Sequence, residues 1–140
     1  MVEKRTLTEI IEVTTAMMAE VESQAFKDET FSQLSMRQML YFNKIIQMES
    51  PTFSDLAREL DVTKPSVSAI VNTLIEKGFV EKVQDQQDKR VYHIALTAQG
   101  RDFDQLHDSV HQRMVSVLTA NLDEQEITTL TELLGKAMDR

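Results

Sequence analysis

The sequence has 140 residues, of which 41% are hydrophobic and 27% are charged; this composition predicts one globular domain, or a subunit that shares its core with another. It contains no cysteine, which excludes a disulfide framework and a thiolate zinc site. No apolar run approaches the ~18 residues that span a bilayer, and the start of the chain lacks a signal-peptide core, so we expect a cytoplasmic protein with no membrane partner. Three glycines and two prolines are typical of a mainly α protein.

The net charge of −8 is unevenly distributed along the chain. Residues 1–50 carry 5 basic and 8 acidic side chains, residues 51–100 carry 6 and 7, and residues 101–140 carry 4 and 8. The negative net charge argues against a protein that binds nucleic acid over its whole surface. It does not determine the local charge of any one face of the folded protein. A basic surface can therefore form only in the nearly neutral middle of the chain.

The first predicted helix begins after a capping box formed by Thr6 and Glu9 and continues to about Phe26. Its apolar residues recur at helical spacing. They are Leu7, Ile10, Val13, Met17, Val21 and Ala25.

A break at residues 27–34 precedes a second capping box, Ser35 with Gln38. We expect a helix from there to about Met48. It should stop at this point because Pro51 disfavours the helical conformation in the residue before it.

The middle of the chain predicts two helices joined by a short turn. Thr52 can cap a short helix, and Thr63 can cap a second helix that ends at Gly78, a typical left-handed C-terminal stop. The inner face of the short helix consists of Leu56, Ala57 and Leu60. Two helices joined by a turn of about three or four residues are the helix-turn-helix arrangement.

The second of these helices has two unlike faces. Val67, Ile70, Val71 and Leu74 form an apolar one. The opposite face is small or polar and consists of Lys64, Pro65, Ser66, Ser68, Ala69 and Asn72. Such a face suits a DNA major groove, which admits one helix and displays hydrogen-bonding edges. The alternative is an ordinary solvated face with short side chains.

A hairpin is predicted directly after this helix, because "FVEKV" and "RVYHIAL" alternate in polarity around the loop "QDQQDK". A hairpin in this place is a wing, whose tip can reach a minor groove and insert an arginine there. Lys89 and Arg90 lie at this tip. Asp88 can hold the Arg90 guanidinium in a bidentate pair, although a solvated surface ion pair of little consequence is the alternative.

Two further helices complete the chain. Thr97 can cap a long one, and Asp123 with Glu126 opens the last. Their apolar positions are Phe103, Leu106, Val110, Met114, Val117 and Leu118 in the long helix and Ile127, Leu130, Leu134 and Met138 in the last. The first and last helices each carry an apolar stripe that a winged domain alone cannot bury. We therefore expect these stripes to pack in a subunit interface.

His107 and His111 are four residues apart and share a helix face, the spacing at which two imidazoles can chelate one metal ion. Asp104 and Asp108 are near them, and Glu20, Glu22 or Asp28 could add a ligand. The alternative is a pair of partly exposed histidines on a dimerisation helix. With two clear ligands where structural zinc wants four, no metal or other cofactor is predicted, and the pair remains a candidate.

The run "FSDLARELDVTKPSVSAIVNTLIEKGFVEKVQDQQDKRVYHIALTAQG" resembles the winged-helix core of the multiple antibiotic resistance regulator (MarR) family. The most specific matches are "DLAREL", "TLIEKGFVEK", the pattern Asp88-x-Arg90 and "LTAQG". The flanking helices match the family's layout, so the resemblance covers nearly the whole chain.

The resemblance implies a winged helix-turn-helix core, of three helices and a β-hairpin wing, flanked by N- and C-terminal dimerisation helices. The expected division is residues 1–34, 35–97 and 98–140 within one intertwined domain. The implied function is that of a homodimeric transcriptional regulator that binds double-stranded DNA at an inverted-repeat operator and responds to a small-molecule effector. The family contains repressors and activators, and we expect a repressor. Carried over by position, Lys64, Ser66, Ser68 and Asn72 are recognition-helix residues, and Arg90 is the minor-groove residue supported by Asp88.

One departure concerns sequence readout. Many relatives carry an arginine among the recognition-helix contacts, where this chain offers Lys64 alone, so specificity can depend on DNA shape. Regulators of this family that respond to zinc or control fatty-acid synthesis carry His-rich stretches in the corresponding helix. The resemblance therefore leaves two alternatives for the effector, a metal ion such as zinc and a lipid.

Other classes of protein remain as alternatives. The sequence offers acid, base and nucleophile residues but no nucleophile elbow and no Gly-rich phosphate loop, so an enzyme is not expected. These residues are Ser66, Ser68, His93, His107 and His111. A winged helix that binds protein instead of DNA is the second alternative.

Overall fold

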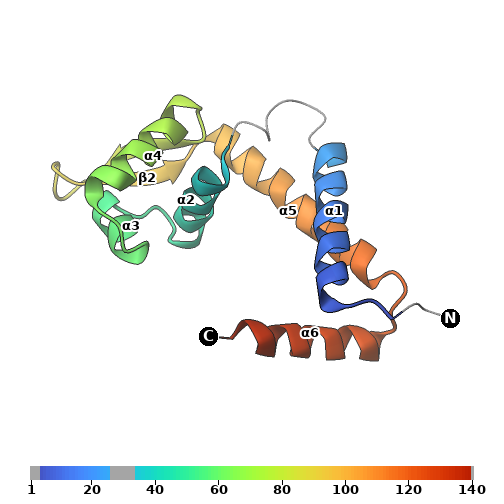
Figure 1. Ribbon diagram of the computed structural model, residues 1–140. Coiled ribbons are helices and arrows are strands. Elements are labelled where there is room, and N and C mark those ends of the chain that lie inside the picture. The colour runs from blue at the N-terminus through green and yellow to red at the C-terminus, as the bar shows by residue number, and fades with distance from the viewer. Residues whose placement is uncertain (1–3, 26–33, 140) are drawn as a thin grey trace. The chain divides into compact units, whose positions relative to one another are not determined.

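The computed structural model describes residues 4–25 and 34–139 (Figure 1). It is mainly helical, as predicted, with one two-stranded sheet. The elements are α1 (Leu7–Ala25), α2 (Met36–Gln47), α3 (Phe53–Glu59), α4 (Lys64–Glu76), β1 (Val80–Gln84), β2 (Tyr92–Leu96), α5 (Ala98–Thr119) and α6 (Glu124–Met138). The predicted end of the first helix at Phe26, most of the break at 27–34 and Asp28 lie outside the described residues. The chain forms two compact units, residues 1–25 with 107–140 and residues 26–106.

Local hydrogen bonds fix where the helices begin. In α1 the Thr6 amide donates to Glu9 Oε2 at 2.7 Å, and the Glu9 amide donates back to Thr6 Oγ1 at 3.2 Å. A cap of this kind stabilises a helix by about 1 kcal/mol because it satisfies amides that have no partner within the helix. The predicted capping residues all accept such bonds: Thr6, Ser35, Thr52, Thr63, Thr97 and Asp123.

The core of the winged unit is built from both helices of the helix-turn-helix and from the wing. The rings of Phe42, Phe79 and Phe103 pack edge to face, with centroids 5.0 to 6.0 Å apart. Fully buried aliphatic side chains surround them: Leu56, Val67, Val71, Leu74 and Ile94. The apolar faces predicted for α3 and α4 are therefore the buried ones, which leaves the opposite face of α4 exposed.

Two glycines connect α4 to the wing and the wing to α5. Gly78 has φ +84°, and the amides of Gly78 and Phe79 donate to the carbonyls of Ile75 and Leu74, so the helix ends in the predicted left-handed stop. At Gly100 a Cβ would collide with the Phe79 carbonyl oxygen. The first turn of α5 thus packs directly on the backbone that leads into β1.

The wing is an antiparallel hairpin in which Val80 pairs with Leu96 and Gln84 with Tyr92. The predicted loop, residues 84–89, is wrong at both ends. Gln84 belongs to β1, and Arg90 and Val91 lie in the loop and not in the second strand. The Asp85 amide donates to the Val91 carbonyl at 2.8 Å, and the Val91 amide donates to the Asp88 carbonyl at 3.0 Å. These two bonds make residues 85–91 the tip and place Arg90 on it.

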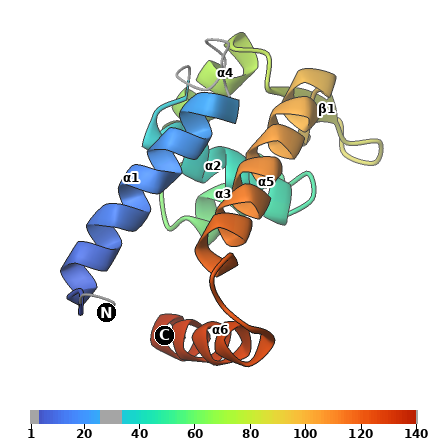
Figure 2. The same cartoon turned by 90° about the vertical axis from the view of Figure 1, so that its right-hand side faces the viewer.

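The other unit contains α1, the part of α5 from residue 107 onward, and α6, which follows the turn after α5 (Figure 2). Val21, Val110 and Met114 are buried, and Arg113 Nη2 donates to Gln24 Oε1 at 3.0 Å. The apolar side chains of the predicted stripes at the chain ends are exposed in the single subunit: Leu7, Ile10, Leu130, Leu134 and Met138. None of the helices in the described part of the chain is long and apolar enough to cross a membrane.

Candidate nucleic-acid interface

The exposed face of α4 begins at its N-terminus. Thr63 Oγ1 accepts from the Ser66 amide at 3.3 Å and contacts the Ser66 hydroxyl at 2.9 Å, so Ser66 takes part in the cap as well as in the predicted face. Ser68 is half-buried. The other predicted members of this face are exposed: Lys64, Pro65, Ala69 and Asn72.

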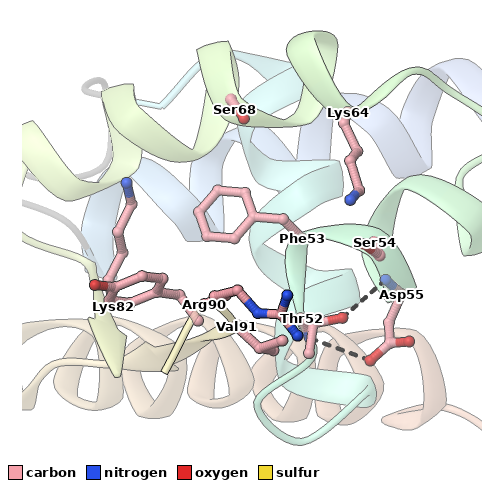
Figure 3. Close-up of a pocket in the computed structure, with 10 residues that line it drawn as sticks. Thr52, Phe53, Ser54, Asp55, Lys64, Ser68, Lys82, Arg90 and Val91 are labelled. Atoms are coloured by element: carbon pink, nitrogen blue, oxygen red, sulfur yellow. Dashed lines mark hydrogen bonds between the residues drawn. The ribbon is translucent and has the colours of Figure 1, made fainter. Parts of the chain in front are cut away.

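A hollow of about 480 Å³ opens between α4, α3 and the wing (Figure 3). Three cationic side chains line it, Lys64 from α4, Lys82 from β1 and Arg90 from the wing tip. Ser68 lines it as well, so residues predicted from two separate motifs lie at one surface. The other predicted residues, Pro65, Ser66, Ala69, Asn72, Asp88 and Lys89, are not part of its lining.

Phe53 and Tyr92 add aromatic surface to the same hollow. The Lys82 ammonium lies 5.3 Å from the centroid of the Phe53 ring, within range of a cation–π contact. Asp55 is the carboxylate of the lining, and it accepts from the Thr52 amide at 3.2 Å. The hydrogen bonds from Thr52 hold the pKa of Asp55 below its usual range, so this carboxylate is ionised at neutral pH.

Arg90 is held at the tip by three hydrogen bonds to one carboxylate. Its Nε and Nη2 atoms donate to Asp88 Oδ1 and Oδ2, each at 3.1 Å, and its amide donates to Oδ1 at 3.0 Å. The predicted bidentate pair is thus present, and the bonds from Arg90 lower the pKa of Asp88. Because 90% of the Arg90 side chain is exposed, the pair directs the guanidinium more than it stabilises the fold.

His93 lies near the tip end of the wing, in β2 opposite Val83. Its Nε2 atom is 2.9 Å from Asp85 Oδ1 and its Nδ1 atom is 3.0 Å from the Ser50 carbonyl oxygen. The bonds to Asp85 and then to Ser50 raise the pKa of His93 above its ordinary value. Ser50 has φ 64°, a left-handed conformation that non-glycine residues adopt infrequently.

Sequence reasoning missed Phe53, Lys82 and Tyr92 as members of this surface. Lys82 and Tyr92 could have been found from strand alternation, since they are in phase with the buried Val80 and Ile94 and so lie on the same face of the hairpin. The contact of His93 with Ser50 has no such signal, because 43 residues separate the two in the chain.

The second predicted site is a histidine pair. The rings of His107 and His111 lie edge to face with centroids 4.4 Å apart. Across residues 4–25 and 34–139 no group of three or more metal-ligating side chains is found, and Asp28, one candidate third ligand, lies outside that range. The structure therefore gives the zinc-responsive alternative no support beyond the pair itself.

A helix-turn-helix followed by a two-stranded wing defines a winged-helix protein. The MarR family model matches residues 34–92, which include the whole helix-turn-helix and most of the wing. The chain belongs to the MarR family.

Three similar proteins illustrate the family. The HTH-type transcriptional repressor YetL of Bacillus subtilis is 28% identical over 73% of this chain and 60% of its own length. The transcriptional regulator AdcR of Streptococcus pneumoniae is 32% identical over 66% of this chain and 68% of its own. The crystal structure of Streptococcus pneumoniae FabT in complex with DNA superposes with a TM-score of 0.70 at 29% identity and covers 94% of both chains. The matched region is thus about 60% of the length of the first of these relatives.

Proposed function

We propose that this protein is a DNA-binding transcriptional regulator that acts as a homodimer on an inverted-repeat operator. The observation that carries the proposal is the hollow at which Lys64 of α4, Lys82 of β1 and Arg90 of the wing tip meet. Three cations on adjacent elements suit a phosphate backbone, whose neutralisation supplies much of the affinity for DNA. The DNA complex of FabT, similar over nearly the whole chain, supports the same conclusion.

In this proposal α4 enters the major groove. Its exposed face carries short side chains, so the helix backbone can come close to the base edges. Asn72 and Ser68 are the groups suited to hydrogen bonds with bases, and Lys64 suits a phosphate or a guanine. Pro65, Ser66 and Ala69 make up the rest of the contact face.

The wing tip enters the adjacent minor groove. Arg90 is the inserted residue, Asp88 fixes its direction through the bidentate pair, and Lys89 beside it contacts phosphate. An arginine directed in this way reads the narrow width and negative potential of the groove.

A second subunit would cover the apolar surface at the chain ends. Leu7, Ile11, Leu133 and Met138 are 79%, 65%, 62% and 72% exposed, and large apolar side chains exposed together typically mark an interaction surface. The proposed regulator is a repressor, which the name of YetL supports, and it works in the cytoplasm, where its operator is. Release by a small-molecule effector is what family membership implies.

Selection of bound fragments from the host genome, followed by fluorescence anisotropy on the selected operator, tests the proposal. We expect specific binding of an inverted repeat, with an affinity that falls steeply as salt rises. Lys136→Ala, which removes one cation from the last turn of α6, is the control for net charge. A protein that selects no sequence, or whose binding does not depend on salt, would instead be a protein-binding winged helix.

A further inference from the structure

His93 joins three segments of the winged unit. It belongs to β2, its Nε2 atom meets Asp85 at the start of the wing tip, and its Nδ1 atom meets the Ser50 carbonyl between α2 and α3. The neighbouring backbone follows the same path, since the Ile94 amide donates to the Pro51 carbonyl at 2.8 Å. The imidazole is therefore a side-chain link between the wing tip and the connection that leads into the helix-turn-helix.

Both atoms that face the ring are acceptors. The Ser50 carbonyl oxygen can only accept a hydrogen bond, and so can an ionised Asp85 carboxylate. A neutral imidazole has one N–H group and can donate to one of them, which leaves the other acceptor facing a ring lone pair. Only the imidazolium, with two N–H groups, satisfies both contacts.

Asp85 connects His93 to the backbone of the wing tip through hydrogen bonds. Its Oδ1 atom faces His93, and its Oδ2 atom accepts from the amides of Gln87 at 3.0 Å and Asp88 at 2.9 Å. Asp88 in turn holds the guanidinium of Arg90. The orientation of Asp85 is therefore coupled to the position of Arg90 through one turn of backbone.

The charges that act on His93 favour its proton. Asp85 faces it from the wing tip and Asp55 from the first turn of α3, where Arg58 lies 3.6 Å from Asp55 and offsets part of its charge. The connection between α2 and α3 contributes the neutral Ser50 carbonyl, and Val83 lies opposite on β1. These surroundings raise the pKa of His93, while the Asp88 amide and His93 lower the pKa of Asp85.

We propose that protonated His93 is the positioning residue of the wing, which holds the tip in the conformation that presents Arg90 to DNA. The proposal rests on the DNA-binding function proposed above. Its consequence is a pH dependence with a definite sign. Because the ordered wing raises the pKa of His93, the stabilisation is present below the ordinary value of 6.5 and is lost as pH rises through the raised pKa. DNA affinity should fall over the same range.

The test compares operator binding at constant ionic strength from about pH 5.5 to about pH 8.5, on both sides of the ordinary histidine pKa. Wild-type affinity should fall as pH rises, by at most about tenfold per wing for each unit by which the ordered wing raises the pKa of His93, because only the loss of ordered wing lowers the affinity. His93→Gln should bind weakly across the range and lose this pH dependence, since a neutral amide cannot donate to both acceptors in this geometry. The matched control is His111→Gln, the same substitution at an exposed histidine, which should keep the wild-type profile.

Asp85→Asn separates a proton-dependent link from simple packing. The amide oxygen can keep the bonds from Gln87 and Asp88 while the amide nitrogen donates to His93 Nε2, and a neutral ring then donates from Nδ1 to Ser50. This variant should keep its affinity at high pH and show a flattened or reversed pH profile. Nitrogen NMR across the same pH range should show the His93 ring losing its second proton at a higher pH in the wild type than in Asp85→Asn.

Two failures can be told apart. A wild type that binds no DNA at any pH overturns the proposed function and the role of His93 together. A wild type that binds its operator with the pH profile of His93→Gln, or whose His93 ring loses its proton at no higher pH than in Asp85→Asn, overturns the inference about His93 alone.

Discussion

Arg90→Ala tests the wing most directly. The side chain is 90% exposed and its hydrogen bonds go to one exposed carboxylate, so the folded state loses little when it is removed. Against DNA the loss is larger, because Asp88 stays behind and brings an uncompensated negative charge to the phosphates. The thermal unfolding temperature should be unchanged while operator affinity drops.

The expected loss is about 1 to 3 kcal/mol per wing, or roughly fivefold to 150-fold in the dissociation constant, and both wings of a dimer carry the change. Removing one phosphate contact should lower the slope of log affinity against log salt by about 0.9 per wing, a difference of about 3.5-fold across a fourfold rise in salt. Fluorescence anisotropy on a labelled operator at several salt concentrations measures both quantities. Lys136→Ala serves as the charge control, and it should change neither.

Arg90→Lys separates charge from direction. Lysine keeps the cation but not the planar fork that Asp88 grips at two atoms, so the salt slope should remain while affinity falls. Wild-type affinity for Arg90→Ala at physiological salt would refute the wing assignment, and wild-type affinity for Arg90→Lys would refute the role given to Asp88.

Four further predictions address other parts of the molecule. Asn72→Ala should flatten base preference at one position in each half-site in a binding selection, whereas a uniform loss over all sequences would make Asn72 a phosphate or packing residue. Gly100→Ala should destabilise the protein by about 1 to 3 kcal/mol, because a Cβ there meets the Phe79 carbonyl, while the matched change Gly135→Ala, with open space around it, should stabilise α6 by up to about 1 kcal/mol in denaturant unfolding. Deletion of residues 1–26 should give an aggregating or unfolded chain in size-exclusion chromatography, and a soluble monomer that binds a half-site tightly would contradict the proposed dimer. Isothermal titration with zinc should give the same result for the metal-free wild type and for His107→Ala/His111→Ala. A binding event that is present in the wild type and lost in this variant would support the zinc-responsive alternative.

The helix starts could be predicted from sequence because each cap is a contact between residues three apart. Thr6 with Glu9 and Ser35 with Gln38 form reciprocal bonds that depend on little beyond the local chain. The same holds for Asp88 and Arg90, which are two residues apart. Proximity in the sequence therefore explains why the caps and the contact between Asp88 and Arg90 were predicted correctly.

The limits of the wing tip were predicted less well, because alternation of polarity cannot tell a strand from the end of a loop. Val91 is apolar and in phase with the strand, yet its amide bonds back to the Asp88 carbonyl and closes the tip. The Ser50–His93 link depends on the packing of the wing against the connection between α2 and α3, and a period of two along one strand contains no information about that contact. Residues that act across elements thus need the structure to be recognised.

Local hydrogen bonding also explains how a chain of net charge −8 can present a cationic surface. The carboxylates of the hollow and of the wing tip already accept hydrogen bonds from the protein. Asp55, in the lining, accepts from Thr52, while in the tip Asp85 accepts from His93 and two amides and Asp88 accepts from Arg90. These hydrogen bonds orient each carboxylate toward its donors. Lys64 and Lys82, in contrast, line the open hollow. Acidic groups beyond about 8 Å are largely screened at physiological ionic strength, so the nearest charges decide the potential that a phosphate meets.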